Sequence, residues 1–220
     1  MNLETFDPEV GAITGATVIL LNGPPRCGKD TAGEYLQSIT PRSCVIKFAG
    51  ALKRSVHADF GLPSHLQEDH FEPCKDAPHP AFFGMTPRQA YIQKSELRQK
   101  PFLGEDIYGR VALRRLWRVY QAGTRVFFFT DSGFAHEAVP IMGVVGNENA
   151  LLLRIHAEQR GCDFKNDSRS YINLDGVKAY DVENNSTLQA FKGLLSRLVP
   201  AFICDRAVFS DRLWPAFAYR

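Results

Sequence analysis

A glycine-rich turn between an apolar run and a helical pattern constrains the fold of this chain more than any other feature. The run ATVILLNG, residues 16–23, is apolar and partly β-branched, as in a buried strand. Residues 29–39 then place apolar side chains at helical spacing. The turn GPPRCGK, residues 23–29, fits the pattern G-x-x-x-x-G-K in the context that gives this pattern meaning. The chain therefore predicts a strand, a phosphate-binding loop and a helix in that order.

The residues of this turn suit the binding of nucleotide phosphates. Glycine lets the backbone wrap closely around phosphate groups, and the loop amides and the helix N-terminus favour negative charge. A lysine at the end of the loop reaches the β- and γ-phosphates. A glycine turn that merely carries a surface lysine is the alternative. We expect the loop to bind ATP through Gly23, Pro24, Pro25, Arg26, Cys27, Gly28, Lys29, Asp30 and Thr31.

Asp30 stands where such loops normally have Ser or Thr, whose hydroxyl would be a ligand of Mg²⁺. The carboxylate of Asp30 could hold Mg²⁺ directly or through water, or accept a proton from an attacking hydroxyl. Thr31 beside it could supply the hydroxyl with a shifted geometry. The remaining alternative is that Asp30 is simply a negative charge stabilised by the helix dipole.

Further candidate residues follow later in the chain. Asp131 ends an apolar strand in TRVFFFTDSG, residues 124–133, which predicts a second acidic group near Mg²⁺ at the same sheet edge. A turn cap is the alternative for Asp131. Arg110 and Arg114 lie four residues apart on a helix predicted over about 106–122, so they share a face and could clamp phosphates. Each arginine could instead be a solvated surface residue.

The rest of the chain alternates between strand and helix signals. Strands are predicted at residues 44–50 and 150–156, and helices at 51–62, 86–100, 135–145 and 187–199, with Thr86 as a cap and Pro87 at the first helical position. This alternation indicates an α/β fold, a doubly wound parallel sheet flanked by helices, of the P-loop NTPase class. We expect a leader at 1–15 and one domain at 16–220, with a proline- and histidine-rich insertion at about 62–87 and a short lid at about 157–172.

Composition restricts the class of protein. The 220 residues are 45% hydrophobic, which is ample for a packed core, and the net charge of +2 is too small to imply a nucleic-acid binder by itself. A local basic cluster could still serve an anionic ligand. Five cysteines without a CxxC pair argue against a disulfide framework and a zinc site. Without a signal peptide or an apolar run of spanning length, a cytoplasmic protein is expected.

The ordered motifs resemble those of the deoxynucleoside monophosphate kinases of large bacteriophages, within the P-loop nucleotide kinases. GPPRCGKDT at 23–31 is similar to the family's G-x-x-x-S-G-K-D-T, so Asp30 looks like the family's normal residue. KFAGALKRSV, TPRQAYIQ, TDSGFAHEA, LLLRI and NNSTLQAF continue the resemblance over roughly residues 16–199. The resemblance implies an ATP- and Mg²⁺-dependent kinase, in the host cytoplasm if the gene is carried by a phage.

Two departures from the family pattern bear on the acceptor. Members commonly have Asp-x-Arg where this chain has Asp131-Ser132-Gly133, and a His-x-Ser-Glu type loop is replaced by GCDFKNDSRSYI at 161–172. Arg169 in that segment could replace the missing arginine. Related phage kinases phosphorylate the hydroxymethyl group of 5-hydroxymethyluracil within DNA, which requires a channel for a flipped base but no clamp for a free monophosphate.

We therefore predict an ATP-dependent kinase of a deoxynucleotide acceptor, with the hydroxymethyl base in DNA slightly favoured over a free monophosphate. An NTP-binding regulatory protein without an acceptor is the alternative of another class. The expected partners are a nucleotide substrate or modified DNA, with no membrane and with a homodimer possible. Arg169 joins the ATP-binding residues. The expected catalytic residues are Lys29, Asp30, Asp131, Arg110 and Arg114, and the expected Mg²⁺ ligands are Asp30, Thr31 and Asp131.

Overall fold

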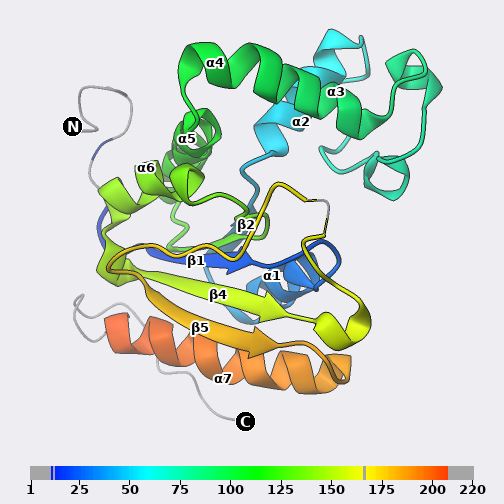
Figure 1. Cartoon of the computed structure of the whole chain (residues 1–220). Helices are drawn as coiled ribbons and strands as arrows, with labels where there is room; N and C mark the ends of the chain where they lie inside the picture. Colours follow the sequence, from blue (N-terminus) through cyan, green and yellow to red (C-terminus); the bar gives the residue numbers. More distant parts are fainter. Residues whose placement is uncertain (1–10, 12, 166, 208–220) are drawn as a thin grey trace.

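The computed structural model describes residue 11 and residues 13–165 and 167–207, and shows an α/β fold (Figure 1). One sheet of five parallel strands has the order β2-β3-β1-β4-β5. Its strands are β1 (Thr17–Asn22), β2 (Ser43–Ile46), β3 (Val126–Phe129), β4 (Ala150–His156) and β5 (Lys178–Glu183). Because the strand order departs from β1 on both sides, the sheet is doubly wound, as the alternation of elements predicted.

Helices flank this sheet. They are α1 (Lys29–Ile39), α2 (Gly50–Asp59), α3 (Pro87–Lys94), α4 (Lys100–Leu103), α5 (Ile107–Gln121), α6 (Ala135–Val145) and α7 (Leu188–Ala207). A π-helical segment, Ser95–Gln99, joins α3 to α4. Short 3-10 turns cover Glu72–Cys74, Pro80–Phe82, Asn147–Asn149 and Glu158–Arg160.

Alternate residues of the central strands supply two separate cores. Val18 and Leu20 of β1 pack on the side of α2, α5 and α6, whereas Ile19 and Leu21 pack on the side of α1 and α7. Figure 1 shows α1 and α7 on one face of the sheet and α5 and α6 on the other. Because both faces are covered, the central strands β1, β3 and β4 are largely apolar on both sides, which is typical of parallel sheets.

Several elements lie where the sequence predicted them. The helices at 29–39 and 135–145 and the strand at 150–156 have the predicted bounds, and the helix predicted over about 106–122 is α5. Thr86 caps α3 by accepting a hydrogen bond from the backbone N–H of Gln89, whose side chain accepts one from the N–H of Thr86. Pro87 occupies the first helical position, as expected. The insertion contains only short 3-10 turns before α3, so its expected lack of regular structure is confirmed.

Other elements differ from the prediction. Strand β2 ends at Ile46 and α2 begins at Gly50, so the expected strand over 44–50 is shorter at its end. The last helix continues past 199 to Ala207 despite Pro200, because Phe202 and Ile203 are buried and hold the final turns against the core. Strand β5 was not predicted, since its sequence KAYDVE is mostly exposed at the edge of the sheet.

The expected leader lies largely outside the described residues, which omit residues 1–10 and 12. Ile13 is buried in the core beside α5 and α6. Within the described ranges, no helix is both long and apolar enough to cross a membrane.

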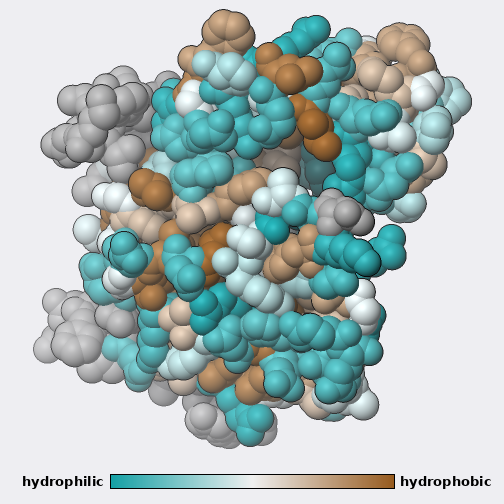
Figure 2. Space-filling model, viewed as in Figure 1, coloured by the Kyte–Doolittle hydropathy of each residue, from teal (hydrophilic) through white to brown (hydrophobic). Residues whose placement is uncertain are grey.

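Exposed apolar side chains occur on the lobe that contains α3 and α4. Figure 2 shows brown residues over this lobe within a mostly teal surface. The large ones are Phe83, Ile92, Leu97, Phe102 and Leu103, of which Phe83 and Phe102 are 85% and 82% exposed.

The crossing of α5 and α6 depends on Gly109. A Cβ added at Gly109 would lie 2.1 Å from the backbone carbonyl oxygen of Glu137. We expect Gly109→Ala to lower the free energy of unfolding by about 2 to 4 kcal/mol, because the backbones of α5 and α6 must move apart to make room for the methyl group. Gly193→Ala in α7 is the matched control, since apart from its chain neighbours and the backbone of its own helix no described atom lies within 4 Å of its added Cβ. We expect that change to stabilise the protein by about 0.5 to 1 kcal/mol in chemical denaturation. Equal effects of the two substitutions would contradict this account.

Candidate phosphate-binding site

The glycine loop, residues 23–28, connects the end of β1 to the start of α1 at the carboxyl edge of the sheet. Gly23 has φ 153°, and a Cβ there would lie 2.6 Å from the carbonyl oxygen of Ile155. Gly28 has φ 102°, and a Cβ there would lie 2.7 Å from Nδ2 of Asn184. Both conformations and both close approaches require glycine. The two glycines of the sequence pattern are thus needed for the path of this loop.

A buried asparagine that directly follows β5 holds the glycine loop in place. Asn184 is 4% exposed and donates a hydrogen bond of 2.9 Å to the carbonyl oxygen of Cys27. Burial raises the pKa of the Cys27 thiol, so this side chain stays neutral. Arg26 adopts a left-handed backbone conformation, with φ 65°, and its side chain is exposed. The loop is therefore held on its inner side and open at Arg26.

Lys29 turns its amine back into the loop. Its Nζ donates hydrogen bonds of 2.7 Å to the carbonyl oxygens of Gly23 and Pro24. Burial lowers the pKa of Lys29. A partly buried ammonium held by two neutral carbonyls and the neutral Cys27 thiol is a favourable partner for an anion, because an anion would add charge-assisted hydrogen bonds. The structure thus brings the predicted lysine and loop together.

Asp30 lies at the start of α1 and contacts two other elements. Its carboxylate is 2.7 Å from Nζ of Lys47, which follows β2, and accepts a hydrogen bond of 2.9 Å from Oγ1 of Thr130, at the end of β3. Gly33 permits this approach, since an added Cβ would lie 2.3 Å from Cγ2 of Thr130. The Asp30 side chain remains 62% exposed, so it is open to a ligand from solvent. Thr31 is exposed on the same turn.

Lys47 connects this site to the insertion. Its Nζ is 2.7 Å from Asp69, and Asp69 and Glu72 both lie 2.6 Å from Nζ of Lys53 on α2. Burial alone would lower the pKa of Lys47, but its hydrogen bonds to Asp30 and Asp69 raise that pKa. Lys47 therefore stays charged, and the chain of ion pairs fixes the insertion beside the glycine loop.

Asp131 reaches the same sheet edge, as the strand pattern predicted. Its two oxygens accept hydrogen bonds of 2.8 and 2.9 Å from the backbone N–H groups of Phe48 and Ala49. These residues immediately precede α2, so Asp131 caps the turn between β2 and α2. Burial raises the pKa of Asp131, and the two amide hydrogen bonds oppose that shift. The turn-cap contact is thus observed, while a role in binding Mg²⁺ stays a prediction.

The two predicted catalytic arginines, Arg110 and Arg114, make different contacts. Arg110 pairs with Asp106, the N-cap of its own helix, at 3.2 Å and donates to the carbonyl oxygen of Leu103 at the end of α4. Arg114 lines a pocket between α5 and α2. The two arginines share α5, as their spacing predicted, but Arg110 contacts the junction of α4 and α5 whereas Arg114 lines the pocket, so a joint phosphate clamp stays a prediction.

Arg169 lies over the turn after β3. A Cβ at Gly133 would be 2.4 Å from Cδ of Arg169, so only glycine leaves room for this side chain. The guanidinium of Arg169 pairs with Asp167 at 2.6 Å, and its charge helps to lower the pKa of Lys29. Arg169, from the segment 157–172, thus lies against the Asp131-Ser132-Gly133 turn, and its role in binding ATP stays a prediction.

Asn22, the last residue of β1, holds this segment in place. It is fully buried, and its amide donates to the carbonyl oxygens of Ser132 at 2.7 Å and Ser170 at 3.1 Å. Its carbonyl oxygen accepts a hydrogen bond of 3.1 Å from the N–H of Ile172. The Asn22 side chain therefore connects β1 to the turn after β3 and to Ser170 and Ile172, which follow Arg169 in the chain.

Replacement of Asn22 is expected to loosen this connection. Asn22→Ala removes all three hydrogen bonds and leaves a buried N–H without its partner, so we expect the free energy of unfolding to fall by about 2 to 3 kcal/mol. Asn173→Ala is the control: Asn173 is exposed and its side chain accepts a hydrogen bond of 2.6 Å from Arg154, so we expect a loss below about 1 kcal/mol. Chemical denaturation of both variants measures the difference. An Asn22→Ala protein as stable as the control variant would contradict the role of this network.

The donor set fits Mg²⁺ better than a transition metal. In the described part of the chain, no group of three or more His, Cys, Asp or Glu side chains could hold a metal. Mg²⁺ does not need such a group, because it keeps several waters and takes one or two protein oxygens together with substrate phosphates. The exposed Asp30 carboxylate and the hydroxyl of Thr31 satisfy that requirement, whereas both oxygens of Asp131 already accept amide hydrogen bonds.

Sequence reasoning missed three residues of this site, namely Asn22, Lys47 and Asn184. Asn22 ends β1, and Lys47 and Asn184 directly follow β2 and β5, at the sheet edge where ligands of parallel α/β proteins bind. The sequence signal for these three residues was therefore only their position at the carboxyl end of a strand.

Comparison with models of known protein families gives no match for this chain, and comparison with curated proteins gives none either.

Proposed function

We propose that this chain is a P-loop kinase that transfers the γ-phosphate of ATP, with Mg²⁺, to a deoxynucleotide acceptor. The observation that carries the proposal is the conformation of the glycine loop. Its glycines are sterically required, and the Lys29 amine is held inside the loop at the start of α1. A lysine, backbone amides and a helix N-terminus converging at one point form a site for polyphosphate.

The neighbouring residues support roles in phosphoryl transfer. Lys29 and the loop amides would hold the β- and γ-phosphates, and Arg169 would offset charge as it develops. Asp30 and Thr31 would hold Mg²⁺, which when bound neutralises charge on the same phosphates. The acceptor oxygen forms a bond to the γ-phosphorus while the bond to the β–γ bridging oxygen breaks, and ADP leaves. The acceptor hydroxyl proton would pass to a carboxylate at this edge, either Asp30 or Asp131.

The favoured acceptor is the hydroxymethyl group of 5-hydroxymethyluracil in DNA. The turn Asp131-Ser132-Gly133 carries no arginine for a free monophosphate, and a basic pocket lies beside Lys47. A deoxynucleoside monophosphate kinase is the second candidate. This second candidate is supported by Arg169, because its side chain packs on Gly133 and so brings an arginine next to that turn.

Release of ADP tests the kinase class. We expect ADP release to be slow with ATP and Mg²⁺ alone and to rise at least about tenfold when a deoxynucleotide acceptor is added. A rate that is the same with and without every acceptor would instead support an NTP-binding regulatory protein.

A further inference from the structure

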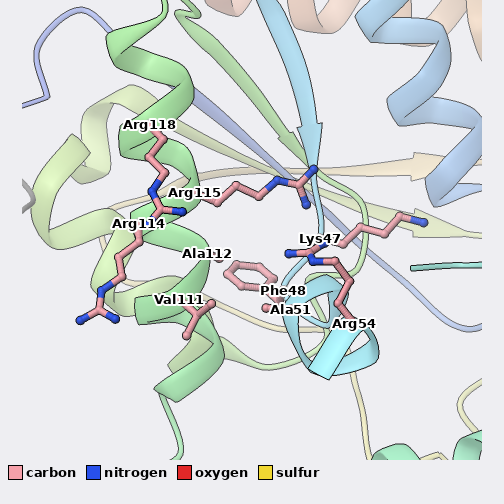
Figure 3. Close-up of a pocket in the computed structure, with 9 residues that line it drawn as sticks. All are labelled: Lys47, Phe48, Ala51, Arg54, Val111, Ala112, Arg114, Arg115 and Arg118. Carbon is pink, nitrogen blue, oxygen red and sulfur yellow. The ribbon is translucent and has the colours of Figure 1, made fainter. Parts of the chain in front are cut away.

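A strongly basic pocket of about 470 Å³ lies between α2 and α5, next to β2 (Figure 3). Of its nine lining residues, five are cationic and none is acidic. Ligand pockets of this size are usually lined by apolar side chains with few polar groups, so the lining itself indicates an anionic ligand. The cations are Lys47, Arg54, Arg114, Arg115 and Arg118.

Phe48 forms the floor of the pocket and is fixed in place by its neighbours. Phe48 is 1% exposed and stacks on Phe129 of β3, with ring centroids 4.7 Å apart. Its backbone N–H is held by Asp131. Figure 3 shows Arg115 extending from α5 across the pocket toward Arg54 of α2, with Arg118 beside α5 and Arg114 directed away from Phe48. The cations therefore project from elements that are fixed to the sheet.

The positive charge of the pocket is only partly balanced. Lys47 pairs with Asp30 and Asp69, both at 2.7 Å. Glu68 of the insertion pairs with both Arg54 and Arg115, at 3.5 Å in the second case, so one carboxylate serves two guanidinium groups. Within the described ranges, Arg118 forms no ion pair. A bound anion would restore the balance, since charge-assisted hydrogen bonds to guanidinium are strong.

Lys47 places the pocket next to the proposed site of transfer. Its side chain lines the pocket, and its Nζ is 2.7 Å from Asp30 at the start of α1. The pocket is thus adjacent to the glycine loop but is built from different residues. A ligand in it could belong to the acceptor without occupying the place of ATP.

We propose that this pocket binds backbone phosphates of the DNA strand that carries the acceptor base. The inference rests on the proposed kinase function. Arg115 and Arg118 are three residues apart on α5, about 4.5 Å along its axis, so they lie on one helical face and can contact neighbouring phosphates of one strand. A single free monophosphate would engage only part of such a row. Contacts to the backbone would position the strand while its base reaches Asp30.

Equilibrium binding of a fluorescent DNA oligonucleotide containing 5-hydroxymethyluracil tests the proposal without catalysis. For Arg115→Ala/Arg118→Ala, we expect the Kd for DNA to rise about tenfold or more, and the slope of log Kd against log salt to fall by about two. Arg118→Ala alone should lower the slope by about one. Arg197→Ala on α7, an exposed arginine on the opposite face of the sheet, is the control and should leave the Kd within about twofold.

Binding of the free monophosphate of 5-hydroxymethyldeoxyuridine is the second arm. We expect the double variant to bind this nucleotide within about twofold of the unchanged protein, because the pocket would contact the backbone rather than the reacting nucleotide. An unchanged Kd for DNA, or an equal loss of affinity for DNA and monophosphate, would overturn the proposal. Failure of the kinase function itself would appear differently, as absence of phosphoryl transfer by the unchanged protein.

Discussion

Replacing Lys29 with alanine is expected to lower the rate of phosphoryl transfer about a thousandfold, because one preorganised cation is lost where charge develops. The amine of Lys29 is already held at the glycine loop by the carbonyls of Gly23 and Pro24. Single-turnover transfer from labelled ATP measures the effect on the chemical step. Thermal unfolding of the same variant separates this effect from a loss of folding.

Lys178→Ala provides the matched control. Lys178 is exposed on β5 at the edge of the sheet, and we expect its removal to change the rate by less than about twofold. A folded Lys29→Ala protein that transfers phosphate as fast as this control would contradict the role assigned to Lys29.

Glu137 is expected to make the protein less stable as the pH rises. Its side chain is 6% exposed, and burial, with a further contribution from the charge of Asp131, raises its pKa from 4.5 to about 8. Below pH 4.5 the carboxyl is protonated in both the folded and the unfolded chain. Between these two values the unfolded chain ionises while the folded chain keeps its proton, so stability falls until the pH passes about 8.

Glu137→Gln isolates this contribution. Glutamine has a similar shape and cannot ionise, so we expect the variant to exceed the unchanged protein by about 2 to 4 kcal/mol in free energy of unfolding at pH 8. The two should differ by less than about 1 kcal/mol at pH 4.5. Urea denaturation across this range gives both curves. Parallel curves would show that Glu137 is ionised in the folded protein.

Local patterns accounted for much of the fold. The glycine loop with its flanking strand and helix, the Thr86 cap and helix α6 depend on neighbouring residues, whose spacing is visible in the sequence. Strand β5 depends instead on pairing with β4, and its exposed residues carry no apolar pattern. The final turns of α7 likewise depend on burial of Phe202 and Ile203 against the sheet.

The site was predictable only in part, because several of its contacts join segments far apart in the chain. Lys29 and Asp30 follow from the loop pattern. That Lys47 pairs with Asp30, or that Arg169 packs on Gly133, depends on how β2 and the segment 157–172 fold around the loop. The spacing of Arg110 and Arg114 correctly put them on one helix, but spacing does not determine which way each side chain extends.

The most direct test of the proposed function is transfer of label from [γ-³²P]ATP when the protein is offered the four deoxynucleoside monophosphates and DNA containing 5-hydroxymethyluracil. We predict label in the DNA that depends on Mg²⁺ and on Lys29. Label in monophosphates alone would reject DNA as the acceptor, and no label in any acceptor would contradict the assignment of this chain as a kinase.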